Sequence, residues 1–306
     1  MRVVVALGGN ALLRRGETPS AKAQRDSIRV VADALAGLMR AGHRLVVTHG
    51  NGPQVALLAL PGEVAGKSGA FPLDVLGAET EGMIGYVLQQ ELDNAYGPPA
   101  RFATLLTQVE VDPDDPAFAR PTKPVGPVYD KQQAHRLAAD RGWTVAHDGD
   151  AGRRVVPSPR PLAILEIEVI RPLVDQGVTV ICAGGGGIRV ARRSDGTFVG
   201  VEAVIDKEHA SGLLAAELGA DAFVMLTDVD AVYADWGTRE QHPIDEATPE
   251  SLSGMDFAAG SMAPKVAAAC AFVERTGGMA GIGALDAVAE SLAGKAGTRV
   301  KPKAQG

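Results

Sequence analysis

Three lysines stand beside glycine or proline turns and could together neutralise a phosphoryl group. Lys123 lies between prolines, Lys207 stands where a helix is expected to start, and Lys265 lies just inside another predicted helix. A single lysine of this kind is normally a solvated surface cation. Phosphoryl transfer, however, needs positive charge around the transferred group from several directions, together with Mg²⁺. The three lysines therefore favour phosphoryl-transfer chemistry.

Two uncharged glycine-asparagine turns suit a small, flat anion. Gly8-Gly9-Asn10 and Gly50-Asn51-Gly52 each follow a short apolar run and precede a helical pattern. They offer backbone N–H groups and side-chain amides but no charge, and a parallel sheet places ligands at such turns. His49, beside the second turn, could act as a base or be a hydrogen-bonded structural histidine, which is the commoner role.

Three other stretches resemble ligand-binding motifs. The stretch 62–68 ends in GlyLysSer but is one residue too short for a phosphate-binding P-loop. The four glycines at 184–187 follow a predicted strand and could let the backbone approach a ligand, although they do not match the dinucleotide motif GxGxxG. Thr227, Asp228 and Asp230 stand at another strand end, where a nucleotide site is more plausible than a calcium loop because Tyr233 replaces the required glycine.

The elements that position these residues alternate between strand and helix. Repeated βα units predict an α/β fold, with a mostly parallel sheet and helices on both faces. Strands are expected at 3–7, 45–48, 178–183, 222–227 and 279–281, an extended segment at 102–111, and helices at 27–40, 79–92, 164–176, 206–218 and 262–275. The proline-rich segment Asp112 to Pro161 breaks this rhythm. We expect it to form a protruding subdomain or lid; the alternative is a tolerated surface insertion.

Composition narrows the function classes. The 306 residues are 46% hydrophobic and 4% aromatic, and the net charge of −7 argues against a nucleic-acid surface. Cys182 and Cys270 have no metal-binding or redox spacing and are expected to be reduced core residues. No apolar stretch approaches the length of a membrane span, so a soluble, cytoplasmic protein of about two lobes is expected.

Ten stretches of the chain resemble the carbamate kinases of the amino-acid kinase superfamily. They follow the family's order and cover nearly the whole chain, at 6–11, 49–54, 72–78, 82–86, 121–127, 153–159, 183–188, 203–207, 226–233 and 260–266. The resemblance implies a three-layer αβα sandwich that forms a homodimer. It implies a carbamate-binding lobe at 1–180, with the lid at about 112–161, and a nucleotide-binding lobe at 181–306. The implied reaction is reversible phosphoryl transfer between ATP and carbamate, giving ADP and carbamoyl phosphate.

The resemblance also implies a role for each site residue. Carbamate and the transferred phosphoryl group would be held by Gly8, Gly9, Asn10, Gly50, Asn51 and Gly52. Lys123, Lys207 and Lys265 would neutralise the phosphates, and Asp206 would orient lysines or Mg²⁺, the ion itself being held mainly by the nucleotide. The nucleotide site would comprise Gly185, Gly186, Thr227, Asp228, Val229, Tyr233 and Met262.

The chain departs from the family's pattern at three positions. Glu208 replaces a common Asp, Arg189 replaces the usual Pro after the glycines, and Glu81 replaces a common Gln. Because none of these changes removes a lysine, activity is expected to survive.

Carbamate is itself an anionic nucleophile, so the transfer needs no general base, only positioning and charge neutralisation. Two alternatives are a kinase of the same fold that acts on another small carboxylate, and a catalytically silent nucleotide-binding protein. The presence of all three lysines argues against the second. The sequence leaves open whether the reaction runs toward ATP, as in arginine fermentation, or toward carbamoyl phosphate.

Overall fold

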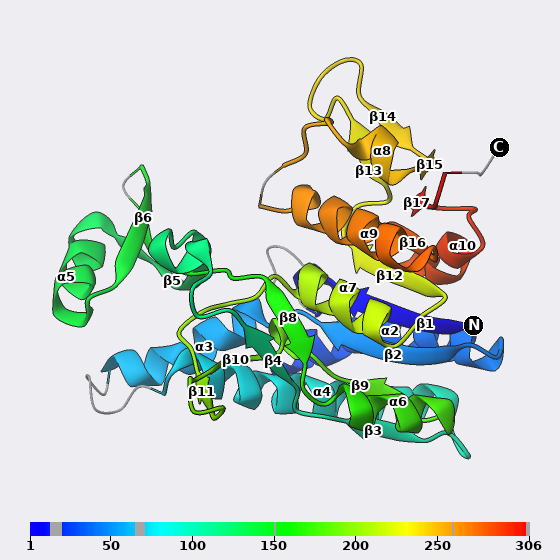
Figure 1. The fold of residues 1–306 in the computed structure, drawn as a ribbon, viewed down its shortest axis with the longest axis horizontal. Helices are drawn as coiled ribbons and strands as arrows, with labels where there is room; N and C mark the ends of the chain where they lie inside the picture. The colour runs from blue at the N-terminus through cyan, green and yellow to red at the C-terminus, as the bar shows by residue number, and fades with distance from the viewer. Residues whose placement is uncertain (13–19, 65–70, 150, 259, 304–306) are drawn as a thin grey trace.

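Alternate burial along the first strand creates the two sides of the fold. In the computed structural model, which describes residues 1–12, 20–64, 71–149, 151–258 and 260–303, strand β1 (Arg2–Leu7) runs through the middle of an eight-stranded sheet (Figure 1). Val4 and Ala6 belong to one buried hydrophobic cluster, and Val3, Val5 and Leu7 belong to the other. Because successive side chains of a strand point to opposite faces, one apolar strand seeds both cores of an αβα sandwich.

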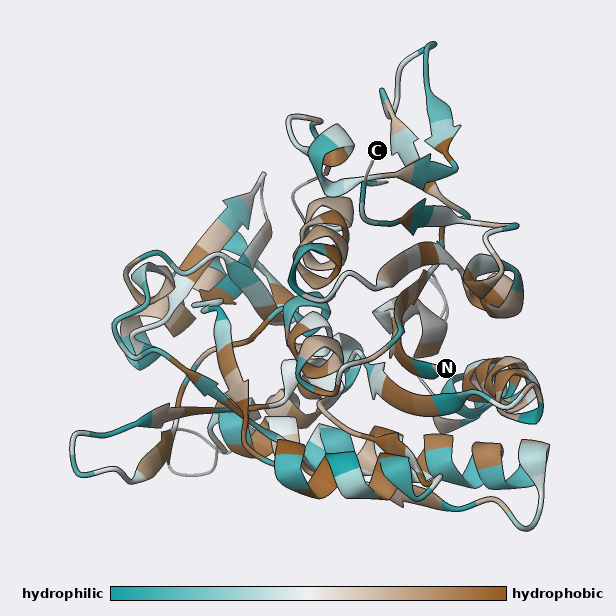
Figure 2. Ribbon diagram, turned by 45° about the vertical axis from the view of Figure 1, so that its right-hand side comes forward, coloured by the Kyte–Doolittle hydropathy of each residue, from teal (hydrophilic) through white to brown (hydrophobic). Residues whose placement is uncertain are grey.

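The strand order of the large sheet is β15-β17-β16-β12-β1-β2-β9-β3. The pairings are parallel except that between β16 and β17. The bounds of the other strands are β2 (Arg44–His49), β3 (Phe102–Thr104), β9 (Thr179–Ile181), β12 (Ala222–Thr227), β15 (Glu246–Ala247), β16 (Met279–Ala284) and β17 (Thr298–Val300). The central strands are strongly hydrophobic (Figure 2), as expected for strands covered on both faces.

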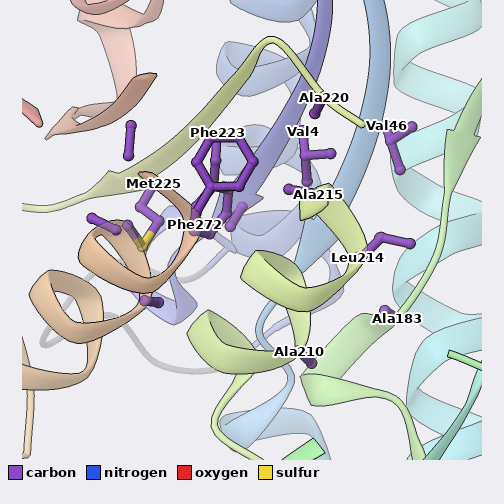
Figure 3. Packing of buried hydrophobic residues seen from close by; sticks show 14 of the residues in the cluster. Val4, Val46, Ala183, Ala210, Leu214, Ala215, Ala220, Phe223, Met225 and Phe272 are labelled. Carbon is purple, nitrogen blue, oxygen red and sulfur yellow. The ribbon is translucent and has the colours of Figure 1, made fainter. Parts of the chain in front are cut away.

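Helices cover each face of this sheet. One face packs against α2 (Ala21–Arg40), α4 (Leu73–Tyr96) and α10 (Val288–Leu292). The other packs against α6 (Ile167–Asp175), α7 (Lys207–Glu217) and α9 (Met262–Thr276). On this second face Phe223 of β12 meets Phe272 of α9 edge-on, with ring centroids 5.7 Å apart (Figure 3).

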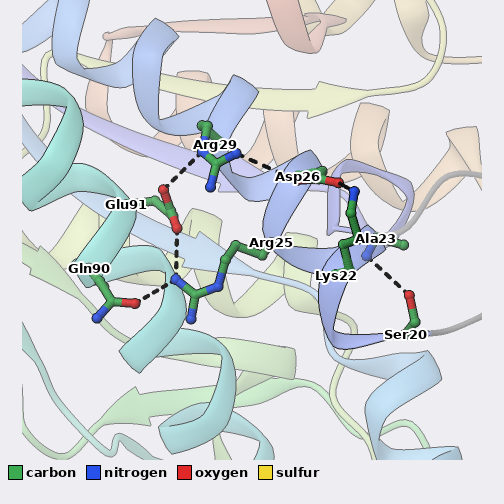
Figure 4. Close-up of polar contacts among 8 residues, drawn as sticks. All are labelled: Ser20, Lys22, Ala23, Arg25, Asp26, Arg29, Gln90 and Glu91. Carbon is green, nitrogen blue, oxygen red and sulfur yellow. Dashed lines mark hydrogen bonds and ion pairs between the residues drawn. The ribbon is translucent and has the colours of Figure 1, made fainter.

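Polar contacts fix α4 against α2. The buried carboxylate of Glu91 in α4 accepts hydrogen bonds from Arg25 Nη1 at 2.7 Å and from Arg29 Nε at 3.3 Å, both in α2 (Figure 4). Ser20 caps the start of α2 by accepting a hydrogen bond from the Ala23 backbone N–H. The long helix α4 is therefore held in place along its C-terminal half, while its N-terminal half reaches the ligand-binding end of the sheet.

A second sheet carries the protruding segment. Its strand order is β11 (Phe198–Gly200), β10 (Ile188–Arg192), β4 (Gln108–Val111) and β8 (Pro161–Ile164). Between β4 and β8 the chain leaves the main body and forms a three-stranded sheet with helix α5 (Lys131–Arg141), which projects to one side (Figure 1). The strands of this lid are β5 (Lys123–Asp130), β7 (Ala151–Val156) and β6 (Thr144–Asp148), in that order across its sheet.

Short elements complete the chain. They are α1 (Gly9–Leu12), α3 (Gly52–Val64), α8 (Pro249–Leu252), the antiparallel pair β13 (Val232–Ala234) and β14 (His242–Ile244), and the 3-10 turns Pro116–Ala119, Gly184–Gly186 and Leu285–Ala287. In the part of the chain that the structure describes, no helix has the length and apolar character of a membrane span, and both cysteines are free thiols.

The structure differs from the sequence expectations in three segments. The extended segment 102–111 is two strands in two different sheets, and the helix expected from Ile164 begins at Ile167 because residues 161–164 pair with β4. The lid also has more regular structure than its prolines indicate. β5 is an edge strand with a register shift between Val125 and Val128. Both features accommodate its prolines, which have no backbone N–H to donate.

Candidate active site

Two cavities meet at the cluster of lysines. The larger, of about 450 Å³, lies beside β12 and α9, and the smaller, of about 230 Å³, lies between the second glycine turn and the lid. Five residues line both cavities: Gly9, Lys123, Asp206, Lys207 and Glu208. A group that passes from one cavity to the other therefore passes the lysine cluster.

The parallel register of the central strands brings the first two turns together. Leu7 at the end of β1 pairs with His49 of β2 on one side and with Leu226 of β12 on the other. Gly8 and Gly50 continue the ladder, since Gly8 N–H donates to the Leu226 carbonyl at 2.8 Å and Gly50 N–H donates to the Leu7 carbonyl at 3.0 Å. The two turns thus lie side by side at the carboxyl edge of the sheet.

Helix N-termini surround the junction. α3 begins at Gly52, α7 begins at Lys207 with Asp206 as its N-cap residue, and α9 begins at Met262. The first N–H groups of a helix have no partner within it, and the helix dipole is positive at this end. This arrangement favours an anion such as a phosphate.

A buried carboxylate holds two of the three lysines. Glu208 Oε1 lies 2.8 Å from Lys207 Nζ and 3.1 Å from Lys265 Nζ. Burial opposes the ionisation of Glu208, but the charges of the two lysines outweigh it and lower its pKa to about 2. Lys265 also donates to the Ser261 carbonyl at 3.0 Å. Glu208 thus fixes both ammonium groups at the junction.

Asp206, which is expected to orient lysines or Mg²⁺, forms an ion pair with Lys123, the first residue of β5 in the lid. Asp206 and Glu208 lie in one helical turn, and the sequence does not indicate which of the two carboxylates reaches Lys265. The Lys123–Asp206 pair joins the lid to the core beside the same cluster.

The five nucleotide-site residues expected from the end of β12 and the start of α9 all line the larger cavity. They are Thr227, Asp228, Val229, Tyr233 and Met262. The structure adds Trp236 and Phe257, which sequence reasoning missed although aromatic residues are scarce in this chain. Tyr233 and Trp236 meet edge-on with centroids 5.4 Å apart, and Trp236 is 62% exposed. A flat aromatic ligand could stack in this cavity.

The expected anion-binding turns distribute over both cavities. Gly8 lines the larger one, Gly9 lines both, and Gly50, Asn51 and Gly52 line the smaller one. Asn10 belongs to α1, but its side chain lies outside the described part of the structure, as do residues 65–70 of the stretch that resembles a P-loop.

Neither of the two tetraglycine residues expected at the nucleotide site lines the larger cavity. Gly185 lines the smaller cavity, and Gly186 lines neither of the two. Both glycines lie close to protein atoms: at Gly185 φ is +65°, and a Cβ there would overlap the Asn51 side chain. At Gly186 a Cβ would overlap the Ile205 carbonyl.

His49 has the structural role. It is fully buried, its Nδ1 lies 3.1 Å from the Gly50 carbonyl oxygen, and it lines neither cavity. Burial lowers its pKa to about 4, so the ring is neutral at neutral pH.

Glu81 of α4 is a second buried acid, beneath the tetraglycine. One carboxyl oxygen accepts a hydrogen bond from the Thr107 backbone N–H at 2.9 Å, and the other has no partner among the described residues. Burial raises the pKa of Glu81 to about 8, despite the opposing effect of Arg189. Glu81 is therefore mostly protonated at neutral pH.

The donor set fits a metal ion that arrives with its nucleotide. Among the described residues no three His, Cys, Asp or Glu side chains form a metal-binding group. The two junction carboxylates, Asp206 and Glu208, are both engaged by lysines. Mg²⁺ is commonly bound through one or two carboxylates and substrate phosphates, with water completing its shell, and this cleft offers oxygen donors of that kind.

The comparisons with known proteins agree on one family. The model of the amino acid kinase family matches residues 1–282. The carbamate kinase of Haemophilus influenzae is 53% identical over 306 residues, which is 100% of this chain and 98% of that protein. The carbamate kinase of Rhizobium meliloti is 52% identical over 300 residues, 97% of this chain and 92% of that protein. The solved structure of the Giardia lamblia carbamate kinase bound to AMP-PNP superposes with a TM-score of 0.91 at 42% identity, covering 99% of this chain and 98% of that one.

Proposed function

The chain belongs to the amino acid kinase family, and we propose that its double cavity transfers a phosphoryl group between ATP and carbamate, giving ADP and carbamoyl phosphate. It is a phosphotransferase with a carboxyl-type acceptor, as its carbamate kinase relatives are by name. The observation that supports this reaction best is the shared wall of the two cavities, where Lys123, Lys207 and Glu208 face both. A nucleotide in the larger cavity and a small anion in the smaller one would meet there.

We propose the following division of labour among the residues. The larger cavity binds ADP or ATP through Thr227, Asp228, Val229, Tyr233 and Met262, and the smaller one binds carbamate through the two glycine turns. Lys207 and Lys265, held by Glu208, neutralise the oxygens of the transferred group, and Lys123 adds a third positive charge from the lid.

No residue has to remove a proton in this scheme. Carbamate already carries the negative charge of a nucleophile, so positioning and charge neutralisation suffice for the transfer. The neutral, buried His49 and the low pKa of Glu208 accord with the absence of a general base.

We propose Mg²⁺ as the cofactor, held mainly by the nucleotide phosphates, with Asp206 and Glu208 as the carboxylates that line both cavities. When bound, the ion neutralises charge on the phosphate oxygens.

We also propose two lobes, residues 1–180 for carbamate and 181–306 for the nucleotide. The central sheet supports this division, because β1 lies between β2 and β12 and carries one turn that lines both cavities.

A homodimer is the assembly that the surface supports. Val30 of α2 and Met83 and Tyr86 of α4 are exposed apolar side chains on neighbouring helices, away from the cleft. Tyr86→Asp should shift the sedimentation coefficient from dimer to monomer. A wild-type chain that sediments as a monomer at micromolar concentration would refute the dimer. We place the reaction in the cytoplasm and in arginine and carbamoyl phosphate metabolism, where its nucleotide and acceptor occur.

The decisive experiment is a coupled assay of ATP formation from carbamoyl phosphate, ADP and Mg²⁺. Acetyl phosphate in place of carbamoyl phosphate tests the alternative acceptor, and we expect the carbamoyl compound to be the better substrate. Lys123→Ala should lower kcat by about 10²-fold or more, since one group that stabilises the transition state commonly contributes that much. Lys131→Ala is the matched control, because Lys131 is an exposed lysine of the same lid. Equal activity of the two variants would contradict the assigned role of Lys123.

A further inference from the structure

Arg189 is a buried cation that the phosphoryl-transfer scheme leaves unused. It stands on β10, directly after the tetraglycine turn, and is only 1% exposed. It nevertheless lines the smaller cavity, together with Asn51, Lys123 and Arg153. It is also one of the positions at which this chain departs from the family's usual pattern.

The packing around Arg189 leaves part of its hydrogen-bonding capacity free. Nη1 donates to the Leu73 carbonyl at 3.2 Å, while Nε is buried and has no partner within the described ranges. A guanidinium has five N–H donors, and a buried donor without an acceptor is unfavourable. Gly77 of α4 makes room for the group, because a Cβ there would lie 2.5 Å from Nη1. The site is thus shaped around an arginine that is not fully satisfied by protein.

The charge of Arg189 is also not neutralised by a direct partner. Among the described residues no carboxylate lies within ion-pair distance of it; Glu81, Asp74 and Glu202 act on it from further away. Glu202 is already paired with Arg154 at 2.7 Å, and Glu81 is mostly protonated at neutral pH. Burial lowers the pKa of Arg189 to about 10, which still leaves the guanidinium charged at neutral pH.

Arg189 lines a cavity, is charged, and has more N–H donors than the acceptors that the described residues offer it, so its guanidinium is a suitable partner for an anion. Its planar fork matches a carboxylate better than the point charge of a lysine does. Lys123 and Lys207 line both cavities and Lys265 lines only the larger one, whereas Arg189 lines only the smaller one. An anion that Arg189 binds is therefore the acceptor rather than the nucleotide.

We propose that Arg189 is a further substrate-binding residue of this chain, whose guanidinium binds the carboxylate of carbamate, or the carbamoyl group made from it, in the smaller cavity. This inference rests on the proposed function, since it names the residue that gives the acceptor site its affinity. The glycine turns of this cavity carry no charge, and Arg189 would add to the positive charge that Lys123 and Lys207 bring to its wall.

The test compares Michaelis constants for the two substrates in Arg189→Gln. We expect the KM for carbamoyl phosphate to rise about 10- to 100-fold, the range for a lost charge-assisted hydrogen bond, while the KM for ADP changes less than twofold. Arg192→Gln is the matched control, because Arg192 is an exposed arginine of the same strand that pairs with Glu110. An unchanged KM for carbamoyl phosphate, or an equal rise of both constants, would overturn the proposal.

A second set of variants separates substrate binding from a merely structural role. Arg189→Lys keeps the charge but loses the fork, so its KM should fall between those of the wild type and Arg189→Gln; this variant decides the question if Arg189→Gln does not fold. Glu81→Gln should leave the KM unchanged, and adding it to Arg189→Gln should not restore affinity. Restoration would mean that Arg189 acts only through Glu81, and would overturn the proposal.

Calorimetric titration with carbamoyl phosphate distinguishes the two possible failures. If the wild type does not turn over carbamoyl phosphate, the proposed function fails whatever Arg189 does. If the wild type turns it over and binds it as tightly as Arg189→Gln does, only the assignment of Arg189 fails.

Discussion

Glu81→Gln should abolish a pH dependence of stability that the wild-type chain carries in its core. The pKa of Glu81 is about 8 in the folded protein because the carboxyl is buried, against about 4.5 for an exposed carboxyl. Between these two values the folded chain holds a proton that the unfolded chain has released. Stability is therefore fully present below pH 4.5 and is lost as the pH rises toward 8.

The size of the effect follows from the same two pKa values. Titration of one such group lowers the free energy of unfolding by at most about 1.4 kcal/mol per pH unit, which gives a loss of about 2 kcal/mol between pH 6 and pH 8. A glutamine at this position can still accept the hydrogen bond from Thr107 and does not titrate. The free energy of unfolding of Glu81→Gln minus that of the wild type should accordingly grow by about 2 kcal/mol over this pH range.

Urea unfolding of both proteins at pH 6, 7 and 8 measures this difference. Groups other than Glu81 titrate in both proteins, so their contributions cancel to first order. Glu79→Gln serves as the control, because Glu79 is an exposed glutamate of the same helix, and its profile should run parallel to that of the wild type. Parallel profiles for Glu81→Gln and the wild type would refute the assignment of a protonated buried acid.

Three further predictions concern the site and its supports. Glu208→Gln should destabilise the fold by about 3 kcal/mol at neutral pH, because its lysine partners lower the Glu208 pKa from 4.5 to about 2. This stabilisation is present above pH 4.5 and is lost as the pH falls toward 2. Glu208→Asp should retain more stability than Glu208→Gln in urea unfolding and more activity in the coupled assay. ADP should change the tryptophan fluorescence of the wild type and of Trp143→Phe but not of Trp236→Phe, since Trp236 lines the larger cavity, where we propose that the nucleotide binds, and Trp143 lies in the lid. A signal that survives in Trp236→Phe would count against this cavity. Gly77→Ala should lower the unfolding free energy by about 1–3 kcal/mol through its contact with Arg189, whereas Gly82→Ala, with open space at the same helix, should not; equal effects would show that the contact is unimportant.

The architecture and the location of the cleft could be predicted from the sequence because they depend on local patterns. Apolar runs such as Val3–Leu7 identify buried strands, and parallel strands present their turns at one edge. The two glycine turns follow such strands directly, so the sequence pattern alone predicts that they lie at the same edge of the sheet, whereas the place of Lys207 beside them is implied only by the family resemblance.

What escaped prediction depends on contacts between distant parts of the chain. The carboxylate that orients Lys207 and Lys265 is Glu208, and only the packing of α7 against α9 brings it to both. The tetraglycine is expected to approach a ligand, and the structure adds that the protein atoms closest to Gly185 and Gly186 belong to Asn51 and Ile205, which the sequence does not indicate.

The burial of two charged residues could not be predicted from the sequence either. Glu81 and Arg189 have the sequence appearance of surface residues, and their burial follows from the way β10 crosses α4. A charged residue is seldom fully buried, so a sequence argument takes it as exposed unless a partner is known.

The lid enters and leaves the core at two residues that are partners in a sheet, since Val111 of β4 pairs with Pro161 of β8. If the whole lid were removed, a tight turn would suffice to join the end of β4 to the start of β8. The lid is in this sense an insertion between two antiparallel strands, β4 and β8, of the second sheet. Because Lys123 belongs to the lid, a single insertion at a permissive site could add the acceptor-side charge while the rest of the sandwich kept its connectivity.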